Sequence, residues 1–227
     1  NGVDRDEWNP EDDKHIAASF SSKKPAGKAA CKAALLRELN LATDRDVPLV
    51  GVVSRLWEQK GLDLAVGVLP KFLREGKLQF VLLGSGDAWL ENEFKRLATD
   101  FPQLCAVRIG YDNGLSHRIE AGCDFFLMPS RFEPCGLNQM YSMAYGTLPI
   151  VRATGGLADT VTGWDGKKSG TGIVFEHADQ GGIEWGLRRA LDLYQQPADY
   201  KALQKTAMEA EFSWAQSAEA HLECYLG

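Results

Sequence analysis

Hydrophobic residues along this chain recur with two different periods, which alternate from residue 48 onward. Short β-rich apolar runs predict strands over residues 49–53, 78–83, 106–109, 125–128, 148–151 and 172–175. Between these runs, apolar residues at helical spacing predict amphipathic helices over 62–73, 90–101 and 183–194. Strands that alternate with helices of this length indicate an α/β fold, with a doubly wound, mostly parallel, Rossmann-like sheet.

The two ends of the chain differ from this alternating middle. Residues 1–46 are polar and charged, with one predicted helix over 29–39, whereas residues 197–227 carry only helical patterns, over 200–210 and 213–226. We expect residues 1–227 to form a single Rossmann-like domain whose α/β core spans 47–196. The glycine-rich segment 163–172 is expected to be an exposed loop.

The chemically most informative segment, Pro-Ser-Arg-Phe-Glu-Pro-Cys-Gly-Leu-Asn-Gln, follows the fourth predicted strand and opens a predicted helix at Gly136. In open parallel sheets, ligands bind where the carboxyl ends of strands meet helix N-termini. The backbone N–H groups of Gly136, Leu137 and Asn138 are expected to attract phosphate oxygens there. The carboxylate of Glu133 in the same segment can accept hydrogen bonds from sugar hydroxyls. This combination predicts a nucleotide-sugar site.

Two cations, Arg55 and Lys60, follow the first predicted strand closely. A diphosphate leaving group gains negative charge as a glycosidic bond breaks, so fixed cations at that point stabilise the transition state more than the ground state. The alternative is a pair of solvated surface cations, and for Glu133 a charge that only complements a helix dipole. Taken alone, the two cations fit the solvated surface better; their position at a strand end, together with the motif match described below, favours the catalytic role.

Four further residues have weaker signals. Tyr111 ends the third predicted strand and is either a packing residue or a platform on which a base stacks. Cys135 is either a small core residue or part of the wall of the donor pocket. Gly155 and Gly156 give the backbone freedom near the same sheet edge. A Gly-x-Gly at 84–86 follows another strand, but alone it is a weak dinucleotide signal.

Composition excludes several classes of protein. The net charge of −6 argues against a nucleic-acid partner, which would normally require a basic face. No apolar run approaches the roughly 20 residues that cross a bilayer, so no membrane partner is expected. The five cysteines form no Cys-x-x-Cys pair, which favours reduced thiols in a cytosol-like compartment. Asp-Arg-Asp occurs at 4–6 and 44–46, outside the predicted strand ends, so we expect no metal or other cofactor.

Six segments, in the same order, closely resemble the bacterial glycogen synthases and plant starch synthases. They are Asn-Gly-Val-Asp (1–4), Ser-Arg-Leu with Gln-Lys-Gly-Leu-Asp (54–63), Glu-Pro-Cys-Gly-Leu (133–137), Tyr-Gly-Thr-Leu-Pro (145–149), Thr-Gly-Gly-Leu-Ala-Asp-Thr-Val (154–161) and Phe-Ser-Trp (212–214). The resemblance therefore covers nearly the whole chain.

The resemblance implies the C-terminal half of a two-domain glycosyltransferase of the GT-B type. Such an enzyme transfers glucose from ADP-glucose to the non-reducing end of an α-1,4-glucan with retention of configuration. It further implies that Arg55 and Lys60 bind the donor phosphates, that Glu133 is the donor-sugar carboxylate, and that Tyr111 is the adenine platform. The last helices would pack toward the enzyme's own N-terminal domain, which carries the acceptor side. We therefore expect this chain to bind nucleotide but to be nearly inactive, in the cytoplasm of a bacterium or the plastid of a plant or alga.

Two alternatives remain. The first is another retaining glycosyltransferase, which uses a UDP- or GDP-sugar. The wider group carries a second Glu eight residues after the first, but here that position is Tyr141, as is typical of glycogen and starch synthases. The second is a non-catalytic nucleotide- or glucan-binding module, against which the presence of Arg55, Lys60 and Glu133 together argues. The choice between ADP and UDP stays open.

Overall fold

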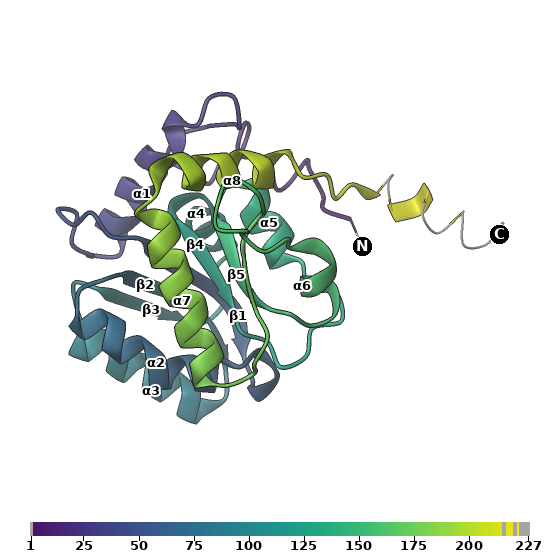
Figure 1. Ribbon diagram of the computed structural model, residues 1–227. Helices are drawn as coiled ribbons and strands as arrows, with labels where there is room; N and C mark the ends of the chain where they lie inside the picture. Colours follow the sequence, from purple (N-terminus) through teal and green to yellow (C-terminus); the bar gives the residue numbers. More distant parts are fainter. Residues whose placement is uncertain (1, 215–216, 220–221, 223–227) are drawn as a thin grey trace.

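Parallel strands in the order β3-β2-β1-β4-β5-β6 form the central sheet. The computed structural model describes residues 2–214, 217–219 and 222, and this sheet has six strands (Figure 1). They are β1 (Leu49–Leu56), β2 (Gln79–Gly86), β3 (Cys105–Ile109), β4 (Phe125–Met128), β5 (Leu148–Arg152) and β6 (Ile173–Phe175). Every pairing between neighbours is parallel, so the predicted doubly wound Rossmann-like fold is confirmed.

Helices connect the strands and cover the sheet, with α7 crossing in front of it in Figure 1. The helices are α1 (Ala26–Glu38), α2 (Leu62–Arg74), α3 (Ala88–Asp100), α4 (Asn113–Gly122), α5 (Asn138–Ala144), α6 (Gly155–Thr160), α7 (Gln180–Tyr194) and α8 (Pro197–Glu209), with a short 3₁₀ turn, η1 (Glu58–Lys60). Helix α7 packs against α2, whereas α1 packs against α4 and α5 packs against α6. Buried parallel strands need this cover because neither face of the sheet meets water.

Successive residues of a strand belong to two different hydrophobic clusters. Val50 and Val52 of β1 lie in one cluster together with Leu127 of β4. Leu49 of β1 and Phe126 of β4 lie in the other. Because side chains alternate across a strand, both faces of the sheet are apolar, and the strands read in the sequence as nearly continuous hydrophobic runs.

The Gly-x-Gly after the second predicted strand is part of the strand itself, not a loop. Strand β1 extends to Leu56, and Ser54 pairs there with Gly84 of β2. A Cβ atom at Gly84 would overlap the carbonyl oxygen of Ser54, and one at Gly86 would crowd that of Leu56. The two glycines therefore allow close approach of neighbouring strands and give no dinucleotide-binding turn.

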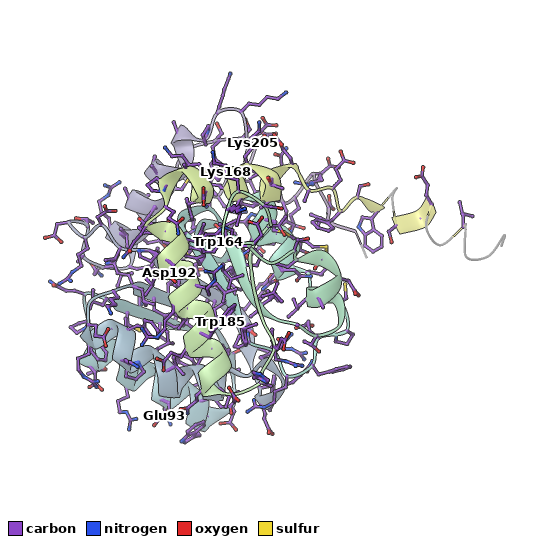
Figure 2. The ribbon with its side chains drawn as sticks, viewed as in Figure 1. Glu93, Trp164, Lys168, Trp185, Asp192 and Lys205 are labelled. Atoms are coloured by element: carbon purple, nitrogen blue, oxygen red, sulfur yellow. The ribbon has the colours of Figure 1, made fainter. Side chains whose placement is uncertain are left out.

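The loop expected over 163–172 is exposed at 163 and 165–169, but one of its side chains is buried. The segment 163–172 contains Trp164, which is only 8% exposed, and the Arg189 guanidinium lies 4.2 Å from the centroid of its ring. Figure 2 shows Trp164 beside α7, which also carries Trp185. The predicted helix over 213–226 lies largely outside the described residues.

Two features bear on the class of protein. Within the part of the chain that the structure describes, no helix has the length and apolarity needed to cross a membrane. The four described cysteines, Cys31, Cys105, Cys123 and Cys135, are free thiols, and Cys224 lies outside the described residues.

Candidate functional site

The candidate site lies where β1 and β4 separate at the centre of the sheet. These strands pair through Val50 with Phe125 and Gly51 with Phe126, and β1 then continues for five more residues beside β2. The order of the strands reverses between β1 and β4, which is the point at which parallel sheets open a crevice for ligands. Two adjoining cavities of about 300 and 290 Å³ occupy this crevice and share Arg55 in their walls. We call them the Glu133 cavity and the Tyr111 cavity.

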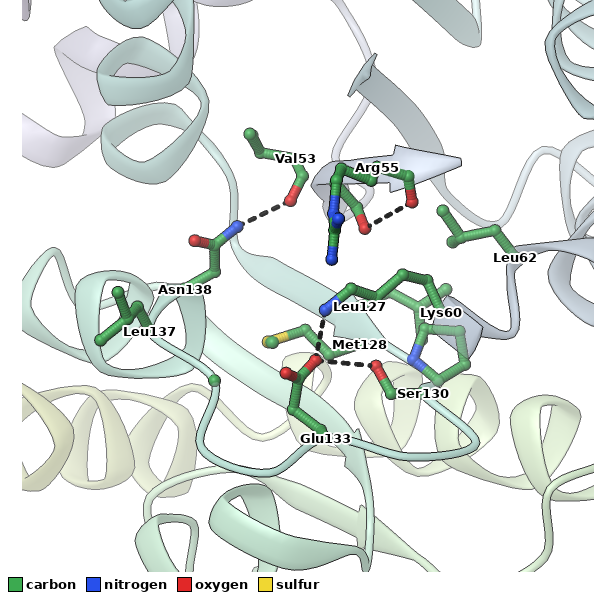
Figure 3. A pocket seen from close by; sticks show the side chains of 13 residues that line it. Val53, Arg55, Lys60, Leu62, Leu127, Met128, Ser130, Glu133, Leu137 and Asn138 are labelled. Carbon is green, nitrogen blue, oxygen red and sulfur yellow. Dashed lines mark hydrogen bonds and ion pairs between the residues drawn. The ribbon is translucent and has the colours of Figure 1, made fainter. Parts of the chain in front are cut away.

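The Glu133 cavity contains a direct ion pair between two predicted site residues. Lys60 Nζ lies 2.5 Å from Glu133 Oε2, and the Ser130 hydroxyl donates to the same oxygen at 3.3 Å (Figure 3). Both charged side chains are largely shielded, at 19% and 8% exposure. Removal of one partner would leave a shielded charge without its counter-ion, so the pair fixes both side chains. The sequence predicted each residue but not their contact.

Arg55 approaches the same cavity from the end of β1. Its side chain extends toward Lys60 and Glu133 in Figure 3. It is exposed and, among the described residues, has no ion-pair partner. Since Lys60 is neutralised by Glu133, Arg55 is the uncompensated cation of this cavity. A ligand phosphate would therefore meet a free guanidinium beside a balanced pair.

The loop that carries Glu133 is fixed on one side by Arg131. The Arg131 guanidinium forms two hydrogen bonds with the Asp63 carboxylate, at 2.6 and 2.7 Å. The backbone N–H of Arg131 donates to the Gln59 carbonyl at 2.8 Å, and the side-chain amide of Gln59 donates to the Phe132 carbonyl at 2.9 Å. The hydrogen bonds from Arg131 lower the pKa of Asp63. This clamp joins the loop after β4 to η1, and thus Glu133 to Lys60.

Two predicted glycines hold the other side of this loop and do not line either cavity. The Gly156 N–H donates to the carbonyl of Glu133 at 3.1 Å. A Cβ atom at Gly156 would overlap the carbonyl oxygen of Cys135, and one at Gly155, whose φ is +43°, would overlap that of Glu133. The start of α6 therefore packs directly on the loop backbone, and the two glycines position Glu133 from behind.

Cys135 also lies outside the lining of both cavities. Its side chain is half-buried, packs against the hydrophobic core, and donates to the carbonyl of Gly136 at 3.2 Å. The structure thus places it as a packing residue of the loop.

The start of α5 faces the Glu133 cavity through Gly136, Leu137 and Asn138. The helix was expected to open at Gly136 but begins two residues later, because Gly136 has a φ of +72°. Within the described part of the chain, the backbone N–H groups of these three residues donate to no protein acceptor. The Asn138 side chain donates to Val53 O at 2.6 Å and so ties this segment to β1.

The Tyr111 cavity adjoins the first at the ends of β2 and β3. Tyr111 is 89% exposed, and its hydroxyl donates to Asn113 Oδ1 at 3.4 Å. Asn113, Ser116 and Glu120 line the cavity from one face of α4. Glu120 is buried, and its Oε2 atom has no hydrogen-bond partner among the described residues. Burial raises the pKa of this carboxyl group well above its usual range.

A stack of rings that the sequence analysis missed supports the wall of the Tyr111 cavity. The Trp8 indole lies between the rings of His117 and Tyr141, at centroid distances of 3.9 and 4.1 Å. The Asp13 carboxylate accepts from the Tyr145 hydroxyl at 2.6 Å and is 2.7 Å from His117 Nδ1. Burial acts to raise the pKa of Asp13, but these hydrogen bonds outweigh it and lower the pKa. Residues from the irregular N-terminal segment thereby complete the site.

Candidate metal ligands do not gather at either cavity. Among the described residues, no group of three or more His, Cys, Asp or Glu side chains is placed to hold a metal ion. Binding without metal or another cofactor stays a prediction.

Comparisons with known proteins agree with this architecture. The family model "Glycosyl transferases group 1" matches residues 39–207. The chain is 51% identical over 225 residues to a glycogen synthase of Anaeromyxobacter sp. (strain Fw109-5), covering 99% of this chain and 47% of that protein. It is 50% identical over 228 residues to a glycogen synthase of Cellvibrio japonicus (strain Ueda107), again covering 99% of this chain and 47% of the relative. The chain thus spans about half the length of these relatives.

A solved structure is similar over the whole chain. The catalytic domain of starch synthase IV from Arabidopsis thaliana, bound to ADP and acarbose, superposes with a TM-score of 0.92 at 38% identity. The match covers 100% of this chain and 48% of that one.

Gly156→Ala tests the contact between α6 and the Glu133 loop. The new Cβ would overlap the Cys135 carbonyl and push the loop away, so we expect a loss of about 1–3 kcal/mol in the free energy of unfolding. Denaturant unfolding measures this loss. Gly163→Ala is the control, since its Cβ would meet nothing closer than 3.5 Å. Equal behaviour of the two variants would contradict this role of Gly156.

Asp63→Asn tests the clamp through its dependence on pH. The folded pKa of Asp63 is lowered from 3.8, so its contribution to stability is present above that pH and is lost as pH falls through the folded pKa. Asp63→Asn should therefore be less stable than the parent at pH 7, with the difference shrinking below about pH 4. Denaturant melts across this range measure it. Asp192→Asn, at an exposed position on α7, is the control and should show no such convergence.

Proposed function

Because the chain belongs to the glycosyl transferases group 1 family, we propose that it is the donor-binding half of a glycogen or starch synthase. The complete enzyme would transfer glucose from ADP-glucose to the non-reducing end of an α-1,4-glucan with retention of configuration. This chain would bind the nucleotide sugar, and its own N-terminal domain would contribute the acceptor side of the cleft. We infer that this chain by itself turns over little or no substrate.

One observation carries the proposal: two cations, a shielded carboxylate and free backbone amides meet in one cavity at the centre of the sheet. Arg55 and Lys60 can contact a diphosphate, and the N–H groups of Gly136, Leu137 and Asn138 can donate to its oxygens. The adjoining Tyr111 cavity offers an exposed aromatic ring on which the base can stack. The site thus offers a ring for a base, cations and amides for a diphosphate, and a carboxylate for a sugar. A nucleoside diphosphate sugar has these three parts in the same order.

The proposed chemistry depends on charge stabilisation. As the bond between the sugar and the diphosphate breaks, negative charge grows on the leaving oxygens, and Arg55 and Lys60 stabilise it. Positive charge grows on the sugar ring, where the Glu133 carboxylate and the departing phosphates stabilise it. The acceptor would then enter on the face that the diphosphate leaves, which retains the configuration.

Glu133 is proposed to hold the donor sugar and not to form a covalent bond with it. A double-displacement enzyme places a second carboxyl group about 5 Å from its nucleophile. Between Glu133 and Tyr145 the sequence contains no second Glu or Asp, and the charged neighbour of Glu133 in the structure is Lys60. Such surroundings suit a departing diphosphate, which needs little protonation.

The choice of nucleotide rests on family likeness. The starch synthase IV structure is described as bound to ADP and acarbose, and by analogy we propose ADP-glucose as donor and an α-glucan as acceptor. A UDP- or GDP-sugar is the alternative donor, and binding in a non-catalytic module is the alternative role. The bacterial relatives favour a cytoplasmic enzyme without nucleic-acid or membrane partners.

Calorimetry with ADP tests the binding site. This chain should bind ADP equally well with and without a chelator, and Arg55→Ala should weaken binding by roughly 10- to 100-fold, the effect of losing a hydrogen bond to a charged group. Arg74→Ala is the control, because Arg74 is exposed at the C-terminal end of α2, whereas the residue of α2 that lines the cavity is Leu62 at its start. Strict dependence on Mg²⁺, or equal affinity of the two variants, would contradict the proposal.

Glu133→Gln separates sugar binding from catalysis. The substitution keeps the shape of the side chain but removes the charge, so donor binding should stay within several-fold while most turnover is lost. Binding is measured on this chain, and turnover on an enzyme that joins it to its N-terminal domain. A glucosyl ester on Glu133, trapped and identified by mass spectrometry, would show instead that Glu133 is a nucleophile.

A further inference from the structure

A third cavity, of about 700 Å³, lies near the amino end of β4, whereas the donor site lies at the carboxyl ends of the strands. Its walls are α1, which contributes Lys28 and Lys32, and α8, which contributes Lys201 and Lys205. Asp124, at the amino end of β4, forms part of its floor. Figure 1 shows α8 lying across this end of the molecule, and Figure 2 shows Lys205 on it. We call these five residues and the space between them the basic cavity.

The charges of the basic cavity do not balance. Among the described residues that line it, Asp124 is the only acidic one. The Asp124 carboxylate is already paired with Lys32 at 2.6 Å and accepts the Leu49 N–H at 2.7 Å. Of the other lysines, Lys205 forms a long ion pair, with its Nζ atom 3.9 Å from Glu209 Oε1. Among the described residues, none places a carboxylate within 4 Å of the Lys28 or Lys201 ammonium. Three lysines of a chain with a net charge of −6 therefore surround one cavity with little compensation.

Lys28 is the most informative of these residues because it is only 7% exposed. Its ammonium donates to Ala121 O at 3.1 Å and to the Thr147 hydroxyl at 2.7 Å. Both acceptors are neutral, and an ammonium has a third N–H to donate. A buried cation without a counter-ion is costly, and proteins normally pair such a group or neutralise it. The Phe20 ring also lies 5.6 Å from this ammonium, but it carries no net charge, so an anion in the cavity would supply the counter-ion.

Burial also makes the charged form of Lys28 less favourable, as its pKa shows. It lowers the Lys28 pKa to about 8, against the attraction of the Asp124 carboxylate. The side chain is therefore partly deprotonated just above neutral pH, and a nearby anion would raise its pKa again.

We propose that the basic cavity binds a small phosphorylated metabolite, whose phosphate contacts Lys28 and the two lysines of α8. A phosphate monoester carries close to two negative charges at pH 7, which suits three lysines with little compensation better than a single carboxylate does. The volume lies in the range of sites for organic ligands and exceeds what phosphate alone requires. Tyr194 and Gln204 in the wall offer polar groups to a hydroxylated portion. This site is separate from the donor site, and only the use of ADP to fill that site in the experiment below rests on the proposed function.

Calorimetry at pH 8 with saturating ADP tests this proposal, since ADP occupies the donor site. Inorganic phosphate and a hexose phosphate are the two probes, each titrated in two buffers of different ionisation enthalpy. We expect binding with uptake of a fraction of a proton, because the anion shifts Lys28 toward its charged form. The hexose phosphate should bind more tightly than inorganic phosphate. Equal affinity would mean that the cavity recognises the phosphate alone, which contradicts a metabolite ligand.

Lys28→Met should weaken binding at least tenfold and abolish the proton uptake. The double variant Lys201→Met/Lys205→Met changes exposed residues only, so it tests the site even if Lys28→Met fails to fold, and it should weaken binding by a similar factor. Lys168→Met, in an exposed loop, is the matched control and should bind as the parent does. No binding at millimolar concentrations, unchanged binding in the double variant, or competition with ADP would overturn the proposal.

Discussion

The short contact between β1 and β4 is the constraint on which the rest of the site depends. Only Val50 and Gly51 of β1 pair with β4, whereas β1 pairs with β2 along its whole length. Beyond Gly51 the chain must therefore close the gap between the two strands with side chains and loops. The Asn138 side-chain amide spans the gap by donating to the Val53 carbonyl of β1. Gly61, directly after η1, packs against the Pro129 carbonyl of the loop after β4. The cavities are the space that this bracing leaves at the ends of the strands.

The ion pair between Lys60 and Glu133 links the two halves of that crevice. Lys60 belongs to the turn after β1, and Glu133 belongs to the loop after β4. Neither segment is regular enough to hold a side chain by itself, so Arg131 fastens one to the other, and Gly156 seats the loop from the opposite side. The geometry of the charged groups is thus set by backbone contacts that carry no chemistry of their own. Substitutions at those contacts would move the charged groups without touching them.

Much of the fold was predictable because its signals are local. Periodicity located the strands of the sheet, and the position of the Glu133 loop at a strand end predicted the site. The pairing of Lys60 with Glu133 was not predictable, because 73 residues separate them in the chain. Gly155 and Gly156 gave a signal of backbone freedom, but the sequence cannot tell a glycine that faces a ligand from one that faces a carbonyl. The roles of Trp8 and Asp13 were missed because the N-terminal segment has no periodic pattern, and its contacts depend on tertiary structure.

The stacked position of Trp8 has a consequence for observing the molecule. Its indole lies in the wall of the Tyr111 cavity, and its ring centroid is 3.9 Å from that of His117. The Nδ1 atom of His117 is hydrogen-bonded to Asp13. Indole emission is sensitive to stacking and to the charge of its neighbours, and this ring is 9% exposed. The domain therefore carries an intrinsic optical reporter in the wall of its proposed base site. With Trp8 isolated by replacing the five other tryptophans, occupancy of that cavity could be followed in real time without attaching a dye.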